Sequence, residues 1–218
     1  MQLSKKLDNF VKKIIFLKSK ILAIGVFFFY STSAYPFVSD AKYALLVDYE
    51  TNQILYEKNS RKKIYPASMS KLMTLYVLFD YLENNIISLD DKIFISENAW
   101  RKGGAISDSS TMFAEVYSYI SLENIIRGIV IHSGNDACIA ISEAISGSEE
   151  IFSNEMNFYA KKLGMIDTNY INSTGLHDSN HFSTPYDMTL LAKSLIRDFP
   201  NFYHYFSEKE FTWNGIFQ

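Results

Sequence analysis

The chain has 218 residues, of which 48% are hydrophobic and 16% aromatic, so it is long and apolar enough to bury a sizeable core. Residues 1–34 carry six of the 21 basic residues and one of the 24 acidic ones, which leaves the remainder with a formal net charge of −8. An acidic chain cannot neutralise phosphates, so we exclude nucleic acid as a partner. The single cysteine excludes an internal disulfide.

The N-terminal segment has the layout of an export signal. Six lysines between Lys5 and Lys20 precede the apolar run Ile21 to Tyr30, and the small residues Thr32-Ser33-Ala34 follow. We therefore predict a signal peptide over residues 1–34. An uncleaved membrane anchor is the alternative, although ten apolar residues are short for a membrane span.

A β-hairpin and a buried helix are predicted next. The β-rich runs Tyr43–Asp48 and Gln53–Glu57 flank a turn at Tyr49–Asn52. Pro66 suits a helix entrance, and the residues from Leu72 onward are apolar on more than one face. This pattern predicts a buried helix that begins after Pro66 and continues to about Leu82.

The start of this helix carries a serine and a lysine three positions apart. Ser68 lies in the predicted first turn, and Lys71 lies one turn later on the same face. A serine hydroxyl becomes a nucleophile when a base takes its proton, and a buried lysine amine can be that base. The spacing fits a Ser-Lys acyl-transfer pair. It also occurs at Ser39–Lys42 and Ser60–Lys63, outside any apolar helix, so a capping serine with a solvated lysine is the alternative for an isolated match.

The middle of the chain alternates helical patterns with turn signals. We predict a short strand, a loop marked by glycines and serines, and three helices, of which the first is capped by its serine and the others end at glycines. These elements are the strand Asp90–Ile95, the loop from Gly103 to Ser110, a helix from Ser121, a helix over Ala137–Ile145 before Gly147, and a helix over Ile151–Leu163 before Gly164.

A second candidate site is Ser133-Gly134-Asn135. The small glycine lets a hydroxyl and a carboxamide approach one ligand from a tight turn, where they could pass a proton and hold an amide. The alternative is a helix cap, because Asp136 lies three residues after Ser133. The similar stretch Ser96-Glu97-Asn98 lies in a polar region. We expect Cys138 to pack in a helix as a small apolar group.

The last third of the chain contains a polar loop, Asn172–Asn180, and a clear helix start. Thr184 is placed as the cap, Pro185 as the first helical residue and Asp187 as the acid in the first turn, so a helix to about Arg197 is predicted. The alternation in Phe211–Gln218 ends in Asn-Gly, as a hairpin begins, but we expect no return strand. The histidines form no catalytic triad. His132 is expected to have a packed or capping role, and His177 and His181 lie in a polar loop.

Both serine motifs resemble those of the low-molecular-weight penicillin-binding proteins, which are serine-type D-alanyl-D-alanine carboxypeptidases of bacterial cell-wall metabolism. The resemblance rests on Pro66–Lys71 and Ile131–Ala137, and it covers residues 38–218. Further segments resemble the family in order: Tyr43–Tyr56, Asn98–Trp100, Ile126–Gly128, Ser173–Leu176, Tyr186–Met188 and Phe211–Gly215.

The resemblance implies an α/β (α+β) fold of the penicillin-binding, β-lactamase-like type, with an antiparallel sheet flanked by helices. Ser68 would attack the penultimate D-Ala of a peptidoglycan stem peptide, and Lys71 would take its proton. Ser133 would relay a proton to the leaving D-Ala, and Asn135 would orient the peptide. β-Lactam antibiotics would acylate Ser68 as inhibitors. The family needs no cofactor or metal and acts in the periplasm or on the outer face of the inner membrane.

One departure from the family concerns its third motif, Lys-Thr-Gly, which this sequence lacks; Lys162-Leu163-Gly164 is the nearest form. We expect residues 38–218 to be an incomplete domain without the C-terminal strands, weakly active or inactive alone, with a separately encoded C-terminal part as a candidate partner. Two alternatives are a non-catalytic remnant that binds peptidoglycan or a partner, and a β-lactamase-like hydrolase. Gly134 lies where β-lactamases usually have Asp, which disfavours the latter.

Overall fold

The structure, a computed structural model, describes residues 10–16, 18 and 37–217. The chain divides into two units, Met1–Ser39 and Asp40–Gln218. In the first unit, residues 10–16 and 18 are helical, whereas the predicted apolar run and cleavage site of the export signal lie outside the described residues. Within the described ranges, no helix combines the length and apolar character that crossing a membrane requires.

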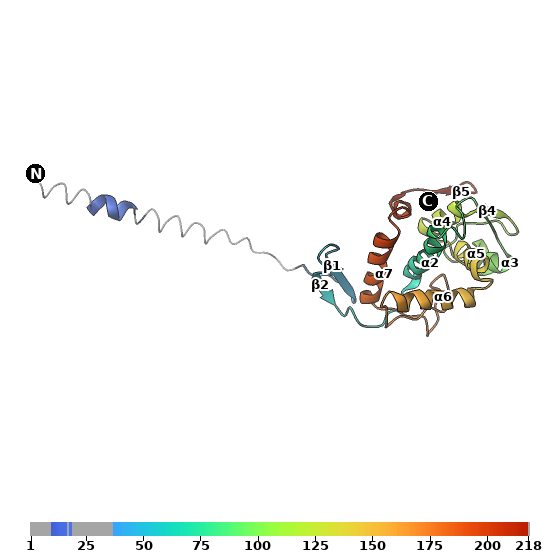
Figure 1. Cartoon of the computed structure of the whole chain (residues 1–218), viewed down its shortest axis with the longest axis horizontal. Helices are drawn as coiled ribbons and strands as arrows, with labels where there is room; N and C mark the ends of the chain where they lie inside the picture. Colours follow the sequence, from blue (N-terminus) through green and yellow to red (C-terminus); the bar gives the residue numbers. More distant parts are fainter. Residues whose placement is uncertain (1–9, 17, 19–36, 218) are drawn as a thin grey trace, which may run out of the picture. The chain divides into compact units, whose positions relative to one another are not determined.

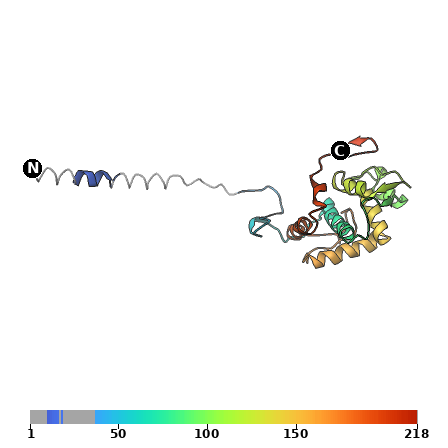
Figure 2. The same cartoon turned by 45° about the horizontal axis from the view of Figure 1, so that its top comes forward.

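The second unit is mainly helical. Figure 1 shows α2 between α7 and α5, with α6 running across them, and Figure 2 shows α2 surrounded by the other helices. The helices are α2 (Lys71–Glu83), α3 (Glu97–Gly103), α4 (Leu122–Val130), α5 (Asn135–Ser146), α6 (Glu149–Lys162) and α7 (Pro185–Asp198), and the 3-10 turns are η1 (Ala67–Ser70), η2 (Ala105–Ser107) and η3 (Tyr203–Ser207).

The strands are short and antiparallel, and those described form three separate two-stranded sheets. The predicted hairpin is confirmed as β1 (Ala44–Val47) and β2 (Ile54–Lys58), with an irregularity in register between Leu46 and Val47. A second pair joins β3 (Lys92–Phe94) to β4 (Tyr119–Ser121). Sequence reasoning predicted β3 but missed β4, because its three residues directly precede a helix and are too few to show an alternating pattern.

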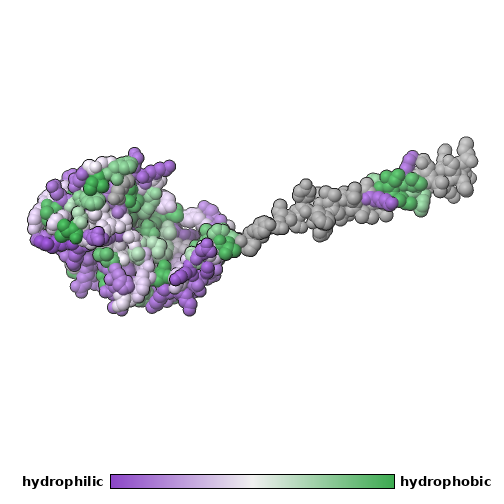
Figure 3. Space-filling model, turned by 180° about the vertical axis from the view of Figure 1, so that it is seen from behind, coloured by the Kyte–Doolittle hydropathy of each residue, from purple (hydrophilic) through white to green (hydrophobic). Residues whose placement is uncertain are grey.

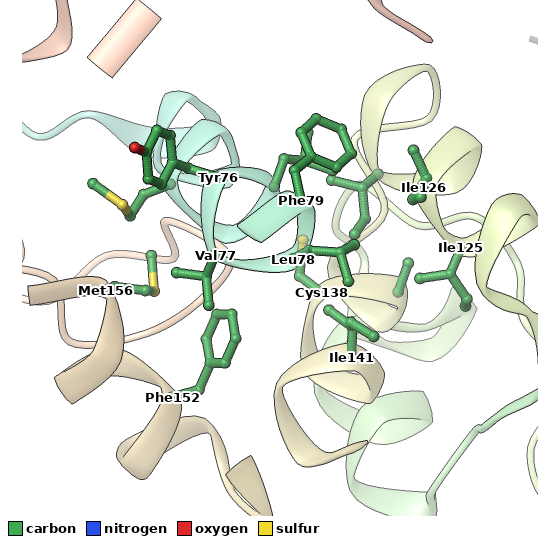
Figure 4. Close-up of a cluster of buried hydrophobic side chains, with 14 of the residues drawn as sticks. Tyr76, Val77, Leu78, Phe79, Ile125, Ile126, Cys138, Ile141, Phe152 and Met156 are labelled. Atoms are coloured by element: carbon green, nitrogen blue, oxygen red, sulfur yellow. The ribbon is translucent and has the colours of Figure 1, made fainter. Parts of the chain in front are cut away.

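Helix α2 is the centre of the core, as its apolar sequence predicted. Figure 4 shows Val77 facing Phe152 of α6, and Leu78 facing Cys138 and Ile141 of α5. All five side chains are fully buried. Because packed interiors tolerate little displacement, neighbours on several sides fix α2 in place, and with it the residues at its N-terminal end.

Outside this core, the surface is mixed. Figure 3 shows one face of the molecule, on which hydrophilic side chains predominate and apolar ones lie between them. This distribution is usual for a folded domain, whose surface always includes some apolar atoms. The long apolar side chains of α2 are instead concentrated in the interior.

Two helix starts differ from expectation. The stretch Ser96-Glu97-Asn98 begins α3, and the Ser96 hydroxyl accepts a hydrogen bond from the Ala99 N–H at 2.9 Å. Sequence reasoning missed this seven-residue helix and assigned the stretch no structure. Conversely, Ser121 precedes α4 as predicted, but its side chain makes no capping hydrogen bond. The predicted start of α7 is confirmed, because the Thr184 hydroxyl accepts from the Asp187 N–H at 3.0 Å.

The C-terminal prediction was wrong in one respect. Strand β5 (Thr212–Trp213) pairs with a return strand, β6 (Ile216–Phe217). Asn214 and Gly215 connect them with φ values of 50° and 75°, which are the left-handed conformations that a tight hairpin turn needs. The return strand is only two residues long, so its pattern could not be recognised from the sequence.

Candidate active site

Ser68 and Lys71 meet at the entrance to α2. Ser68 was predicted in the first turn of the α-helix, but it lies in the 3-10 turn η1 that directly precedes the helix, and Lys71 is the first residue of α2. The Lys71 Nζ donates to the Ser68 Oγ at 3.2 Å. Ser68 is exposed, whereas Lys71 is only 4% exposed. The pair therefore presents a hydroxyl to solvent with an amine buried behind it.

The environment of Lys71 makes its amine easier to deprotonate than that of an exposed lysine. Burial lowers the pKa of Lys71, while the nearby Cys138 and Asp136 on α5 act in the opposite direction. The Thr174 carbonyl also accepts a hydrogen bond from Nζ at 2.8 Å. In its neutral form the amine can keep donating to this carbonyl while its lone pair accepts the Ser68 proton, which reverses the direction of the hydrogen bond between Nζ and Oγ. This geometry is within the reach that a general base needs.

The loop that supplies Thr174 fits closely over the start of α2. The Thr74 hydroxyl donates to the Ser173 carbonyl at 2.7 Å, one turn after Lys71. Gly175 has a φ of 83°, and a Cβ there would lie 1.9 Å from the Ala67 carbonyl oxygen. Only glycine therefore fits this close approach of two backbones. Ala67 itself has a φ of 50°, a strained conformation directly before Ser68.

Ser133-Gly134-Asn135 forms the turn that leads into α5. Ser133 has a φ of 54°, Gly134 is the cap residue, and no side chain makes a capping hydrogen bond. The capping alternative is therefore wrong. The Ser133 Oγ and the Asn135 Oδ1 are buried without a hydrogen-bond partner in the described part of the chain. Buried polar atoms usually have partners, so these two are available to a ligand or water.

Asp136 holds a neighbouring loop in place instead of capping a helix. Its buried carboxylate accepts hydrogen bonds from the Thr111 hydroxyl at 2.7 Å and from the Met112 and Ala114 N–H groups at 2.9 Å each. The Asn135 Nδ2 donates to the Ser109 hydroxyl at 3.0 Å. The loop before β4 is thus attached to the second motif.

Close packing also explains Gly103 and Gly134. A Cβ on Gly103 would lie 2.3 Å from the Asp136 nitrogen, and one on Gly134 would lie 2.9 Å from the Asp136 Oδ1. Gly134 has a φ of −61°, so it is needed for space rather than for an unusual backbone conformation. The sequence analysis had instead assigned this glycine to the approach of Ser133 and Asn135 to a ligand, which stays a prediction.

The structure joins Ser68 to Lys71 directly, but within residues 37–217 no hydrogen bond joins either of them to Ser133 or Asn135. The two motifs are connected electrostatically through α5, because the carboxylate of Asp136 raises the pKa of Lys71 against the effect of burial. The other serine–lysine spacing at Ser60 is not a pair. Ser60 is buried and donates to Glu57, and Lys63 lies over the Phe182 ring at 3.7 Å.

Other predicted residues have structural surroundings. Cys138 is fully buried in α5, and burial raises the pKa of its thiol to about 12, so its packing role is confirmed. His132 is 4% exposed and its Nε2 donates to the Phe211 carbonyl at 3.0 Å, which confirms a packed role. His177 is exposed and contacts the Tyr65 ring. No group of three or more metal-ligating side chains converges among the described residues.

Sequence reasoning missed Thr174, Asp136 and Ser109 as parts of the site. Thr174 lies 103 residues from its partner Lys71, and a distance of that kind leaves no local pattern. The one usable signal was Asn172 followed by Gly175. The Asn172 side chain accepts from the Gly175 N–H at 2.7 Å, which is the local turn that such a sequence favours.

The part of the chain that matches known proteins includes both serine motifs. Residues 31–218 match the family described as D-alanyl-D-alanine carboxypeptidase. The Escherichia coli D-alanyl-D-alanine carboxypeptidase DacC is 42% identical over 180 residues, which cover 82% of this chain and 45% of that protein. The chain spans about half the length of the curated relatives that it matches.

Solved structures give the same result. Penicillin-binding protein 5 from Haemophilus influenzae matches with a TM-score of 0.81 at 37% identity, covering 85% of this chain and 54% of that one. A penicillin-binding protein from Listeria monocytogenes, in an ampicillin-bound form, matches with a TM-score of 0.71 at 28% identity, over 83% and 72% of the two chains. The expected penicillin-binding fold is therefore confirmed, and the chain belongs to the D-alanyl-D-alanine carboxypeptidase family.

Proposed function

We propose that this chain carries the acyl-transfer site of a serine-type D-alanyl-D-alanine carboxypeptidase, which removes the terminal D-Ala from peptidoglycan stem peptides. The observation that carries the proposal is the exposed Ser68 hydroxyl 3.2 Å from the buried Lys71 amine. Membership of the family supports the reaction class and the substrate.

In the acylation step, the Ser68 Oγ bonds to the carbonyl carbon of the penultimate D-Ala as its proton passes to the Lys71 Nζ. The backbone N–H of Ser68 is one donor to the developing oxyanion. The C–N bond to the terminal D-Ala then breaks, and Ser133 relays a proton to the leaving amine. Asn135 orients the peptide, for which its unpartnered Oδ1 is suited.

In the second step, water adds to the acyl ester at Ser68. The C–O bond breaks, the shortened stem peptide leaves as a carboxylate, and the serine regains its proton. A β-lactam presents a strained cyclic amide to the same hydroxyl. Its ring opens but its fragments stay tethered, so we propose that β-lactams inhibit by forming a stable ester at Ser68.

A Lys-Thr-Gly motif is absent from the 218 residues. In the family this motif lies on a strand beside the nucleophile, where it supplies a second oxyanion donor and a cation for the terminal carboxylate. Loss of one oxyanion donor costs on the order of 10²–10³ in rate. We therefore propose that these 218 residues alone acylate more slowly than they do together with a strand that carries Lys-Thr-Gly.

The N-terminal segment gives the proposed location. The lysine-rich start and the apolar run of residues 1–34 support export, to the periplasm or to the outer face of the inner membrane. A fusion of these residues to a reporter that is active only after export tests this proposal. Reporter activity that persists without residues 1–34 would contradict it.

The proposed chemistry is tested with a fluorescent penicillin. The full chain is incubated with the label, alone and as a fusion with the C-terminal part of the Escherichia coli relative, and the adduct is located by peptide mapping. We expect a covalent adduct on Ser68 that Ser68→Ala abolishes. Ser39→Ala is the matched control, because Ser39 has the same spacing to a lysine.

The outcomes separate the readings of the chain. If the fusion is labelled and the unfused chain is not, the result supports Ser68 as the nucleophile and shows that the third motif is required. Rapid release of opened penicillin indicates a β-lactamase-like hydrolase. No adduct in either form, with muropeptide binding retained, contradicts the enzymatic proposal and leaves a binding protein.

A further inference from the structure

A buried histidine that lies much later in the sequence contacts η1, the turn that carries Ser68. The His181 Nε2 lies 2.8 Å from the Ser70 Oγ, and the two residues are separated by 111 positions. Ser70 is completely buried and His181 is 2% exposed. Ser70 lies between Ser68 and Lys71 in the last position of η1, so this bond attaches to the serine–lysine motif itself.

The direction of this hydrogen bond follows from the other ring nitrogen. The Ile171 N–H donates to the His181 Nδ1 at 3.2 Å, so Nδ1 carries the lone pair. In the neutral ring the proton must then lie on Nε2, which donates to the Ser70 hydroxyl. Burial lowers the pKa of His181 to about 4, although Asp178 acts in the opposite direction, so the ring is neutral at pH 7.

The same segment makes the other contacts at the start of α2. We call residues 171–181 the strap. Besides His181, the strap contributes the Thr174 carbonyl that accepts from Lys71 and the Ser173 carbonyl that accepts from Thr74. A Cβ on Gly175 would lie 1.9 Å from the Ala67 carbonyl oxygen and 3.0 Å from the Ser70 Oγ. The strap therefore contacts the motif on both sides of Ser68.

The strap is itself fixed where His181 lies. The His181 N–H donates to the Asp178 carbonyl at 3.0 Å, and the following Phe182 exchanges backbone hydrogen bonds with Asn169 at 2.9 and 3.0 Å. The imidazole ring packs against the Tyr170 ring in a T-shaped arrangement, with ring centroids 5.5 Å apart. A donor on a fixed backbone can hold its acceptor in one orientation, which a mobile loop cannot do.

We propose that His181 is a positioning residue for the Ser68–Lys71 pair: its Nε2–H holds the Ser70 hydroxyl, and this contact keeps η1 and the strap in the register that places Ser68 on the Lys71 amine. The proposal rests on the proposed function, because a consequence for acyl transfer requires that Ser68 be the nucleophile. His181 itself does not touch the reacting atoms.

The first test measures the ring directly in the full chain and does not depend on activity. Long-range ¹H–¹⁵N NMR of the histidine rings, assigned with His181→Gln, reports the tautomer and the titration of each ring. We expect His181 to have its proton on Nε2 and to stay neutral down to about pH 5. A ring with its proton on Nδ1, or one that titrates near pH 6.5, overturns the proposal.

The second test compares acylation by the fluorescent penicillin in three variants. His181→Phe keeps a flat buried ring but removes the donor, His181→Gln keeps a donor, and His204→Phe changes an exposed histidine away from the site. We expect His181→Phe to slow acylation about 10- to 100-fold, as small displacements of reacting groups do, in protein shown to be folded. His181→Gln should recover most of the rate, and His204→Phe should match the wild type.

Ser70→Ala completes the comparison, because it removes the acceptor. The double variant Ser70→Ala, His181→Phe should be no slower than the slower single variant, since both remove one interaction. Full additivity, or a folded His181→Phe variant that acylates at the wild-type rate, overturns the proposal.

A further measurement keeps the two proposals separable. If no form of the protein is acylated, the proposed function fails, and the titration of the Lys71 side chain still decides the role of His181. The ¹³Cε shift of Lys71 should titrate at a different pH in His181→Phe than in the wild type and His204→Phe. Identical titrations in all three would show that His181 does not position Lys71.

Discussion

The turn that carries Ser68 and the turn that carries Ser133 differ in how their polar groups are satisfied. Around Ser68, the amine of Lys71 and the hydroxyl of Ser70 both have partners in the strap. Around Ser133, the Ser133 Oγ and the Asn135 Oδ1 are buried without a partner in the described chain. The first turn is thus preorganised by its own protein, whereas the second has polar capacity left for something that binds.

This difference matches the roles proposed for the two turns. A nucleophile and its base must already be aligned when a substrate arrives, because their geometry sets the barrier. Groups that hold a substrate amide and relay a proton need free donors and acceptors until it binds. We call the Ser68 turn the closed turn, because its polar groups have partners within the protein, and the Ser133 turn the open turn, because two of its polar atoms have none in the described chain. Substitutions in each turn test this difference, from the largest expected effect to the smallest.

The largest effect is expected for Lys71, whose amine contacts both the Ser68 hydroxyl and the Thr174 carbonyl of the strap. Lys71→Arg supplies a cation at this position but cannot act as a base, because arginine does not lose its proton. We expect both Lys71→Arg and Lys71→Ala to reduce the rate of penicillin acylation by about 10³-fold or more, since removing a base that acts with its nucleophile is costly. Lys63→Ala, from the spacing that forms no pair, is the control. A Lys71→Arg variant that keeps the rate would show that a cation at this position is sufficient and that no general base is needed.

A large loss of stability is expected when a side chain is added where the strap and η1 are in close contact. Gly175→Ala places a methyl group 1.9 Å from the Ala67 carbonyl oxygen at a φ of 83°. Gly147→Ala is the matched control, because Gly147 has a φ of 79° and nothing within 4 Å of the added carbon. Left-handed backbone costs about 1–2 kcal/mol without glycine, and overpacking adds about 1–3 kcal/mol.

Urea unfolding measures both glycine variants. We expect Gly147→Ala to lose only the backbone share, and Gly175→Ala to lose about 2–5 kcal/mol in total, together with acylation. Equal losses in the two variants would mean that the strap can move away from η1, and the closed turn would be less rigid than its contacts indicate.

The neutral state of His181 predicts a pH dependence of stability. An unfolded histidine binds a proton near pH 6.5, whereas burial lowers the pKa of His181 to about 4 in the folded chain. As the pH falls from 6.5 to 4, the unfolded state gains a proton that the folded state does not, so stability declines. The maximum loss from this residue is about 3 kcal/mol.

The comparison with His181→Gln isolates this contribution. Glutamine does not titrate, so the difference in unfolding free energy between the wild type and His181→Gln should shrink as the pH falls through this range. His204→Gln, at an exposed histidine, should follow the wild type. A difference that stays constant between pH 7 and 4 would show that His181 titrates with the same pKa in the folded and the unfolded chain, and that burial does not keep it neutral.

The smallest effect on stability is expected for Ser133, in the open turn. Because the Ser133 hydroxyl has no partner, Ser133→Ala removes no hydrogen bond, and we expect unfolding free energy to change by about 0.5 kcal/mol or less. Acylation by penicillin should nevertheless be slower. Asp136→Asn is the contrast, because an amide nitrogen cannot accept and one or two of the three hydrogen bonds from the neighbouring loop are lost, which should destabilise the chain by about 1–3 kcal/mol.

Local signals predicted the closed turn better than its partners. Pro66 and the apolar residues after it marked the helix that holds Ser68 and Lys71, and Thr184 with Pro185 marked the start of α7. The same kind of reasoning missed β4 and the return strand β6, since two or three residues carry no periodicity.

The open turn shows what local patterns cannot give. Ser133 and Asp136 have the spacing of a capping box, yet Asp136 turns toward the loop at Met112, 24 residues earlier in the chain. The partners Thr174 and His181 lie more than 100 residues from the residues that they contact. Their contribution depends on tertiary packing, and no pattern in the sequence around Ser68 reveals it.

The long stretch of sequence between η1 and the strap also has a consequence for biogenesis. A ribosome synthesises the chain from its N-terminus, so Ser68 and Lys71 emerge about a hundred residues before the groups that align them. Contacts over such a span form slowly, because the long loop must close first. We therefore expect a nascent chain that ends before residue 171 to hold an unreactive serine, and reactivity to arise only as one of the last events of folding.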